Sequence, residues 1–239
     1  MNITVINGTE RRGCTFAMKN LFLAAMGEGH SVTEYFLSRD CPEFCTGCKA
    51  CFFSGISACP HAKYTVPVWE SILAADLLVF TSPTYVFHAT AQTKAFLDHY
   101  GSKWMAHSPE APMFHKQAVI LVSAAGQGMG KTVKDIRDSL DFWGAARTYA
   151  VKQALFQAKW EDVSDKRKAA AKRKCEAAAA KVKSAKHVNP RLKIKGIFAM
   201  MKMAHKMIDK GERKAGREHT KDYLYWKENG WLDGEKPWK

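Results

Sequence analysis

Residues 7–15, which read NGTERRGCT, combine the groups that bind a phosphate monoester. Two glycines, the hydroxyls of Thr9 and Thr15 and the guanidinium of Arg11 or Arg12 stand directly before a stretch with helical periodicity. Backbone N–H groups at a helix start attract anions, and an arginine adds charge-assisted hydrogen bonds. The alternative is a simple helix cap with exposed arginines. The residues expected in the phosphate cradle are Thr9, Arg11, Gly13, Cys14 and Thr15.

Neither common nucleotide motif fits this loop. A P-loop would end in Gly-Lys-Ser/Thr, and a dinucleotide fold would read G-x-G-x-x-G. Within the cradle, Cys14 contributes either its backbone N–H or a thiol whose pKa is lowered by the helix start.

A second group of chemically active residues is a run of cysteines. Five of the seven cysteines lie between residues 41 and 59, and the segment 45–51 has the spacing C-x2-C-x2-C. Such spacing lets a short loop surround one iron–sulfur cluster, whereas three ligands so close together would strain a zinc site. The alternative is a set of reactive or packed thiols. The predicted cluster ligands are Cys45, Cys48, Cys51 and Cys59.

The elements that must position these residues alternate between two periods. Short apolar runs at 3–6, 77–80 and 118–122, the alternating segment 31–37 and a last short segment at 149–154 predict five strands. Helical spacing at 15–26, 68–75, 90–104 and 131–143 predicts the helices between them. Runs such as 77–80 and 119–122 have few polar positions, as strands of a parallel sheet buried on both faces require. The sequence therefore predicts a doubly wound α/β fold.

In such a sheet, ligands bind beyond the carboxyl ends of the strands. Besides the loop at 7–15, two more loops stand there: 81–87, which reads TSPTYVF, and 123–128, which reads SAAGQG.

These loops together resemble the flavodoxin-like NAD(P)H-dependent FMN reductases over roughly residues 1–150. The resemblance is carried by the first loop, the loop at 123–128 and the matching residues Ala75, Asp76, Ser82, Pro83, Tyr85, Lys94, Phe96 and Asp98. The first loop departs from the family pattern, since it is one residue shorter and has Glu10 in place of proline and Cys14 in place of asparagine. An acidic Glu10 beside a phosphate has to point to solvent or pair with Arg12.

The resemblance implies an FMN site with the cradle at its phosphate end. The turn at 83–87 would then meet the polar edge of the flavin ring, and glycines at 126 and 128 would let the backbone approach its far side. The alternative is that Tyr85 and Phe87 are core or interface aromatics. Beyond the cradle, the expected FMN contacts are Pro83, Thr84, Tyr85, Val86, Phe87, Ser123, Ala124, Gly126 and Gly128.

The cysteine spacing is similar to that of the iron–sulfur flavoproteins, which place a 4Fe-4S cluster beside FMN on the same fold. That resemblance implies an alternative function, a one-electron carrier between the cluster and FMN.

Length, composition and charge bound the remaining possibilities. The 239 residues are 46% hydrophobic and 25% charged, as in globular proteins, and no secretory signal or long apolar run is visible, so we expect a cytoplasmic protein. The formal net charge of +14 lies in the second half, because residues 152–239 contain 24 Lys and Arg against 11 Asp and Glu, whereas residues 1–151 are nearly neutral. We therefore expect an FMN-binding domain at 1–155 and a basic helical extension at 156–239.

The extension predicts two helices and a docked tail. Residues 166–186 are rich in Ala and Lys, and beyond 190 apolar residues recur at helical spacing among lysines. Packing on the domain or a second subunit is the simplest interpretation; an anionic membrane surface and a redox partner are the alternatives, and nucleic acid is disfavoured. The aromatic residues 223–232 are expected to dock within the chain or across an interface.

The resemblance implies an oxidoreductase that passes electrons from a nicotinamide nucleotide through FMN to a small acceptor such as a quinone, a nitro compound or a metal chelate. It also implies a homo-oligomer. Because the cofactor carries the reaction, no catalytic side chain is required, and the sequence has no Ser-His-Asp order or histidine metal motif typical of hydrolases. His88 and His99 lie near the predicted site, with an exposed position as the expectation for both.

Overall fold

A computed structural model describes residues 1–185 and 187–239. Its centre is a sheet of five parallel strands in the order β2-β1-β3-β4-β5. The strands are β1 (Asn2–Asn7), β2 (Ser31–Phe36), β3 (Leu77–Pro83), β4 (Gln117–Ala124) and β5 (Arg147–Ala154). The order and the parallel direction confirm the predicted flavodoxin-like doubly wound fold.

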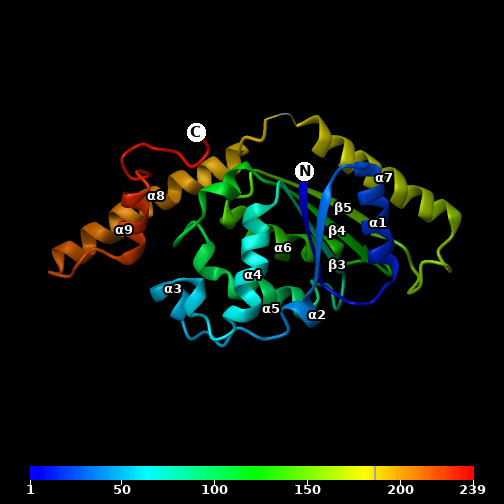
Figure 1. Cartoon of the computed structure of the whole chain (residues 1–239), viewed down its shortest axis with the longest axis horizontal. Coiled ribbons are helices and arrows are strands. Elements are labelled where there is room, and N and C mark those ends of the chain that lie inside the picture. The colour runs from blue at the N-terminus through cyan, green and yellow to red at the C-terminus, as the bar shows by residue number, and fades with distance from the viewer. Residues whose placement is uncertain (186) are drawn as a thin grey trace.

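Helices cover both faces of the sheet (Figure 1). On one face lie α1 (Cys14–Met26) and α7 (Asp165–Ser184). On the other lie α4 (Ala62–Ala74), α5 (Ala91–His99) and α6 (Met129–Trp143), with the short α2 (Leu37–Asp40) at the edge. The short α3 (Ala50–Ser54) and three 3-10 turns (Ile56–Ala58, Gly101–Lys103 and Ala111–His115) complete this part of the chain.

The strand side chains divide between two cores, as the pleat of a sheet requires. Leu77 and Val79 face α1 and α7, whereas Leu78 and Phe80 face the helices of the other side. All four are at most 1% exposed, so this central strand is buried on both faces, as its apolar run predicts.

Some boundaries differ from the prediction. The helix expected at 90–104 ends at His99 and continues as a 3-10 turn. Helix α4 begins at Ala62 instead of Val68 and contains Pro67, because the buried Thr65, Val68 and Trp69 hold this helix against the core despite the missing N–H.

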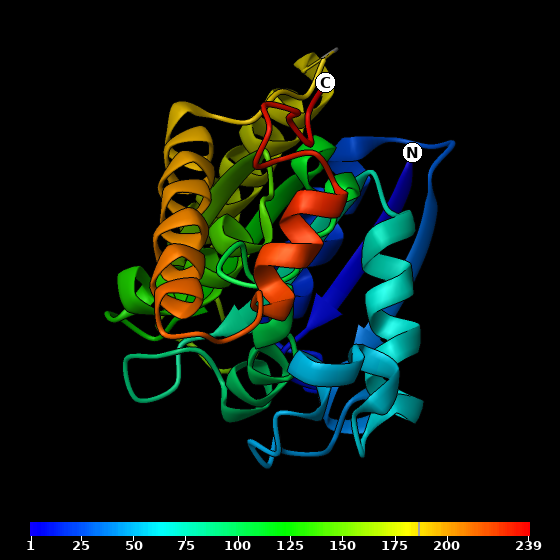
Figure 2. The same cartoon turned by 90° about the vertical axis from the view of Figure 1, so that its left-hand side faces the viewer.

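The basic extension is helical, as predicted. Helix α7 turns its alanines inward and packs in the same core as α1. Helix α8 (Leu192–Lys214) and helix α9 (Lys221–Glu228) lie at the other end of the molecule (Figure 1), the end that faces the viewer in Figure 2. The domain boundary after residue 155 stays a prediction, and α7 is a covering helix of the sheet.

The aromatic tail docks within the chain. Trp226, Trp231 and Leu232 form a third core with Phe198 of α8 and with Phe114 from the segment before β4. Trp226 donates from Nε1 to the His107 carbonyl at 2.9 Å, which attaches α9 to the body of the protein. None of the described helices is long and apolar enough to cross a membrane.

Candidate functional site

The first strand end is fixed by a tight backbone approach. Gly8 donates its N–H to the Thr81 carbonyl at 2.8 Å, and its own carbonyl accepts the Thr90 hydroxyl at 2.7 Å. A Cβ at Gly8 would collide with Thr93 Oγ1 and lie 2.9 Å from the Thr81 carbonyl oxygen. A glycine is therefore required where β1, β3 and the start of α5 meet.

The expected cradle lies directly after this point. Gly13 precedes α1 without a side-chain cap, so the first N–H groups of the helix have no partner within the helix. Thr9 Oγ1 accepts the Arg11 N–H at 3.2 Å, and the Thr15 hydroxyl lies 2.5 Å from that of Ser123. This last contact joins the start of α1 to the end of β4. Glu10 is exposed, as its position beside a phosphate site requires.

A cavity of about 290 Å³ opens at this edge of the sheet. It brings together ten of the fourteen expected cofactor contacts, from three loops that are far apart in the sequence. These ten are Thr9, Arg11, Gly13, Cys14, Thr15, Pro83, Thr84, Tyr85, Ser123 and Ala124.

The other four expected contacts lie outside the lining of this cavity, and their role stays a prediction. Val86 is 92% exposed and Phe87 53% exposed at the tip of the turn, both with positive φ. Gly126 lies beneath Phe156, and Gly128, at φ 88°, packs against Thr84 and Phe87 at the start of α6.

Sequence analysis missed a fourth wall, the segment after β5. Phe156, Gln157 and Ala158 line the cavity together with Ala125. Arg11 donates from Nη2 to the Ala158 carbonyl at 3.0 Å, and the Cys14 thiol donates to the Gln157 carbonyl at 3.4 Å. The predicted fifth strand pointed to this segment, because the carboxyl end of a parallel strand lies at the same edge of the sheet as those of its neighbours.

Phe156 occupies an unusual conformation for a residue with a side chain. Its φ is 60°, its ring is 55% exposed, and the Arg167 guanidinium lies 4.4 Å from the ring centroid. Left-handed backbone at a bulky residue costs on the order of 1 kcal/mol, and such residues concentrate at functional sites.

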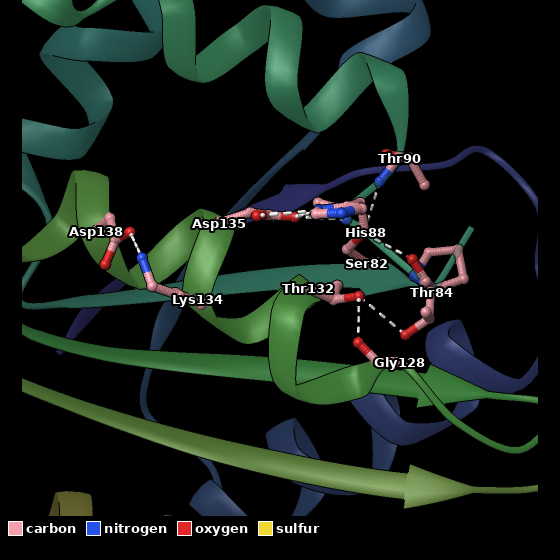
Figure 3. Close-up of polar contacts among 11 residues, drawn as sticks. Ser82, Thr84, His88, Thr90, Gly128, Thr132, Lys134, Asp135 and Asp138 are labelled. Carbon is pink, nitrogen blue, oxygen red and sulfur yellow. Dashed lines mark hydrogen bonds and ion pairs between the residues drawn. The ribbon is translucent and has the colours of Figure 1, made fainter. Parts of the chain in front are cut away.

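The turn that carries Tyr85 is anchored from α6 (Figure 3). Tyr85 and His88 exchange two backbone hydrogen bonds of 2.9 and 3.0 Å. Asp135 accepts the Ala89 N–H at 3.0 Å and lies 3.1 Å from His88 Nδ1, while the Thr132 hydroxyl donates to Thr84 Oγ1 at 3.0 Å. The turn is therefore held at both ends, whereas its apolar tip is exposed.

The two histidines noted in the sequence have different surroundings. His88 is exposed, as expected. His99 is 2% exposed, with Nε2 2.9 Å from the Glu43 carbonyl oxygen, so the expectation of an exposed His99 is wrong. The inward face of α5 buries it beneath the cysteine loop.

The cysteine loop gives no support for a metal centre. Cys45 and Cys48 are exposed, Cys51 and Cys59 are half-buried, and no three His, Cys, Asp or Glu side chains among the described residues lie close enough to hold a metal ion. The four-cysteine cluster stays a prediction.

Burial shifts the pKa of several cysteine thiols. It raises the pKa of Cys51 and raises that of Cys41 to about 12. The pKa of Cys14 is also raised by burial, which outweighs the nearby Arg11. A reactive thiolate at the start of α1 was therefore the wrong alternative, and the backbone N–H of Cys14 is what this position offers a ligand.

Solved structures share this architecture at low sequence identity. An azoreductase from Bacillus anthracis aligns with a TM-score of 0.61 at 16% identity, covering 76% of this chain and 99% of that one. An NAD(P)H:quinone oxidoreductase from Methanothermobacter marburgensis gives 0.61 at 16% identity, covering 78% and 99%. An FMN-dependent NADH-azoreductase from B. anthracis, solved in complex with FMN, gives 0.57 at 11% identity, covering 76% and 99%.

No curated protein sequence matches the chain. The profile of a protein family does, and the description of that family is NADPH-dependent FMN reductase. The match spans residues 1–161, which contain all five strands and every wall of the cavity. The chain is therefore an NAD(P)H-dependent oxidoreductase of flavodoxin-like fold and belongs to the NADPH-dependent FMN reductase family.

Proposed function

We propose that the cavity at the carboxyl edge of the sheet binds FMN, and that the enzyme transfers electrons from NAD(P)H to a planar conjugated acceptor of the quinone or azo class. The observation that carries this proposal is the single cavity in which the uncapped start of α1, Arg11 and the aromatic Tyr85 turn meet.

The phosphate end of FMN fits the start of α1. The unpaired first N–H groups of the helix and its dipole favour an anion, and Arg11 contributes a positive charge. A guanidinium has five N–H donors, and the bond to the Ala158 carbonyl uses one of them. Arg11 can therefore hold the segment after β5 and a phosphate at the same time.

The ring end fits the opposite part of the cavity. Pro83, Thr84 and Tyr85 form one wall and Phe156 another, so an apolar ring system would lie among aromatic side chains with polar backbone groups near its edge. At about 290 Å³ the cavity is close to the lower end for sites of drug-sized ligands, so the ligand fills it and extends into its open mouth.

When bound, FMN supplies the redox chemistry, by accepting a hydride from the nicotinamide and delivering electrons to the acceptor. The residues of this chain bind and orient. Arg11 and the start of α1 fix the phosphate, while the bonds of Asp135 and Thr132 hold the Tyr85 turn in place. None of these side chains has to become covalently attached to a substrate.

The mouth of the cavity favours one class of acceptor. Tyr85 and Phe156 are 47% and 55% exposed there, and such aromatic surfaces favour a flat, conjugated acceptor over a compact metal chelate. The likeness to an azoreductase and a quinone oxidoreductase supports the same choice.

The test is reconstitution with FMN followed by NAD(P)H oxidation with a quinone, an azo dye, a nitroaromatic and a ferric chelate in turn. We expect FMN-dependent turnover, faster with the quinone or the azo dye than with the chelate. Arg11→Gln should lose FMN on gel filtration, while Arg12→Gln, a neighbouring exposed arginine outside the cavity, should retain it. Full FMN occupancy in Arg11→Gln would refute the cradle, and no turnover with any acceptor would refute the activity.

A further inference from the structure

Helix α8 exposes an apolar stripe that the protein leaves uncovered. Met200, Met203, Met207 and Ile208 are 47%, 60%, 66% and 54% exposed. At about 100° per residue the three methionines fall within about 60° of one another around the helix axis, so they form one row. Scattered exposed apolar residues are ordinary on a protein surface, but a continuous row along one helix face marks an interaction surface.

The rotation of α8 is fixed by contacts on its inner face. Phe198 stacks on Trp226 with ring centroids 4.7 Å apart, and His205 lies at the same distance from Trp226. Asp209 Oδ1 lies 2.6 Å from His219 Nδ1. Since these buried residues are opposite the methionine row, the helix cannot turn that row inward without breaking the third core.

Lysines border the methionine row on one side. Lys202, Lys206 and Lys210 are spaced four residues apart, and with Met203, Met207 and Ala199 they line a shallow groove. None of the three lysines forms an ion pair within the part of the chain that the structure describes. Lysine stems can lie along an apolar surface while their ammonium groups reach outward, as at membrane interfaces.

The charge of α8 selects an anionic occupant. The helix has seven Lys and Arg against two carboxylates, and both carboxylates, Asp209 and Glu212, are engaged in ion pairs, with His219 and Arg217. A second copy of this chain would place the same lysines opposite one another. The like charges would repel, as would the formal net charge of +14 on each copy. Apolar side chains beside unpaired lysines are the pattern of a helix that lies in the interface of an anionic bilayer.

We propose that the face of α8 formed by Met200, Met203, Met207, Ile208 and Lys202, Lys206, Lys210, the methionine–lysine face, docks on an anionic lipid surface. The methionines enter the boundary between headgroups and acyl chains, and the lysines contact the lipid phosphates. Helix α8 lies at the end of the molecule away from α7 (Figure 1), and none of its residues lines the cavity at the carboxyl edge of the sheet.

The test is co-sedimentation of the full-length protein with vesicles of phosphatidylcholine alone or mixed with phosphatidylserine. We expect binding only to the mixed vesicles and a decrease with added salt. Met207→Glu should weaken binding by about tenfold, because it removes buried apolar surface and adds a repelled charge. Replacing Lys202, Lys206 and Lys210 by Gln should weaken it by roughly fivefold for each lysine.

The matched control is Val32→Glu, the same charge change at an exposed apolar position on β2, 42% exposed and outside α8. It should leave vesicle binding unchanged, and circular dichroism should show that all variants stay folded. The proposal is overturned by equal binding to both vesicle types, by no binding to either, or by a Met207→Glu variant that binds as tightly as the wild type.

Two other occupants give distinct results. A dimer in sedimentation velocity that Met207→Glu converts to a monomer would assign the face to a second copy, which would also overturn the proposal. Binding to a soluble polyanion that depends on the lysines but not on Met207 would assign it to an acidic macromolecule, with the same consequence.

Discussion

The two edges of the same sheet use their polar groups in opposite ways. At the amino edge, Lys116 Nζ donates to the Leu73 and Ala75 carbonyls at 2.6 and 2.5 Å, and Gln117 donates to the Val182 carbonyl. At the carboxyl edge, the helix start behind Gly13 has no side-chain cap, and Phe156 is held in a left-handed conformation. Lys116 and Gln117 at the amino edge are therefore satisfied within the fold, whereas the carboxyl edge leaves helix N–H groups and a strained residue beside a cavity.

The two edges therefore have different roles, because the amino edge contributes to stability and the carboxyl edge to ligand binding. Substitutions at the amino edge should change the free energy of unfolding without changing FMN affinity. Substitutions at the cavity walls should change FMN affinity, with an effect on stability only where the backbone itself is crowded.

The largest expected effect is at Gly8, where both properties meet. Gly8→Ala places a Cβ against Thr93 Oγ1 and the Thr81 carbonyl, so we expect a loss of about 3 kcal/mol in the free energy of unfolding and weaker FMN binding. The measurement is urea unfolding followed by FMN titration.

The control for Gly8→Ala is Gly130→Ala in the first turn of α6, where a Cβ meets no atom within 4 Å. It should be neutral or stabilising by up to about 1 kcal/mol. Equal stability of the two variants would show that the crowding at Gly8 does not exist.

The next largest effect concerns Lys116 at the amino edge and the pH dependence of the free energy of unfolding. Burial lowers the pKa of Lys116 from 10.5 to about 8, so between these values the unfolded chain binds more protons than the folded one. The contribution of Lys116 to the free energy of unfolding therefore rises with pH across this window. Between pH 7 and pH 10 the wild type should gain about 2 kcal/mol relative to Lys116→Met.

The measurement is urea unfolding of both proteins at each pH, so that titrating groups they share cancel. FMN affinity should be the same in both. Parallel pH curves would show that Lys116 keeps an ordinary pKa, and an altered FMN affinity would break the separation between the two edges.

The smallest expected effect on stability is at Phe156. In Phe156→Gly, relief of the left-handed backbone opposes the lost contact with Arg167 and the greater freedom of the unfolded chain, so the free energy of unfolding should change by less than about 1 kcal/mol. FMN affinity should fall by roughly threefold to tenfold, because an aromatic wall of the cavity is lost.

Gln157→Ala is the control for Phe156, since Gln157 is exposed and contacts Cys14 only through its backbone carbonyl. Because Gln157 lines the cavity but brings no aromatic ring, the variant's FMN affinity should fall by less than about threefold, which is less than in Phe156→Gly. If Phe156→Gly binds FMN normally, the segment after β5 is a covering loop and not a wall of the site.

The sequence could predict the features that local patterns encode. Apolar runs located the strands, and the loops at residues 7–15, 81–87 and 123–128 follow from strand ends, so ten cavity residues were predictable. The wall at 156–158 was not recognised because its residues match no binding motif, although the predicted parallel β5 had to end at this edge, where the Ala158 carbonyl accepts a hydrogen bond from Arg11.

Burial was the second gap. The position of Cys14 at a helix start suggested a lowered thiol pKa, and His99 was expected at the surface, but burial raises the pKa of Cys14 and encloses His99. Helix α3 within the cysteine loop was also unpredicted, because a five-residue helix has too few turns to show periodicity.

The central claim is that the start of α1 and Arg11 form a phosphate cradle for the flavin. The most direct test is to titrate the protein with FMN and with riboflavin, which lacks only the phosphate, and to follow quenching of flavin fluorescence. We predict that FMN binds at least about tenfold more tightly than riboflavin, and that Arg11→Gln removes most of this difference. Equal affinity for the two flavins, or no binding of either, would contradict the account.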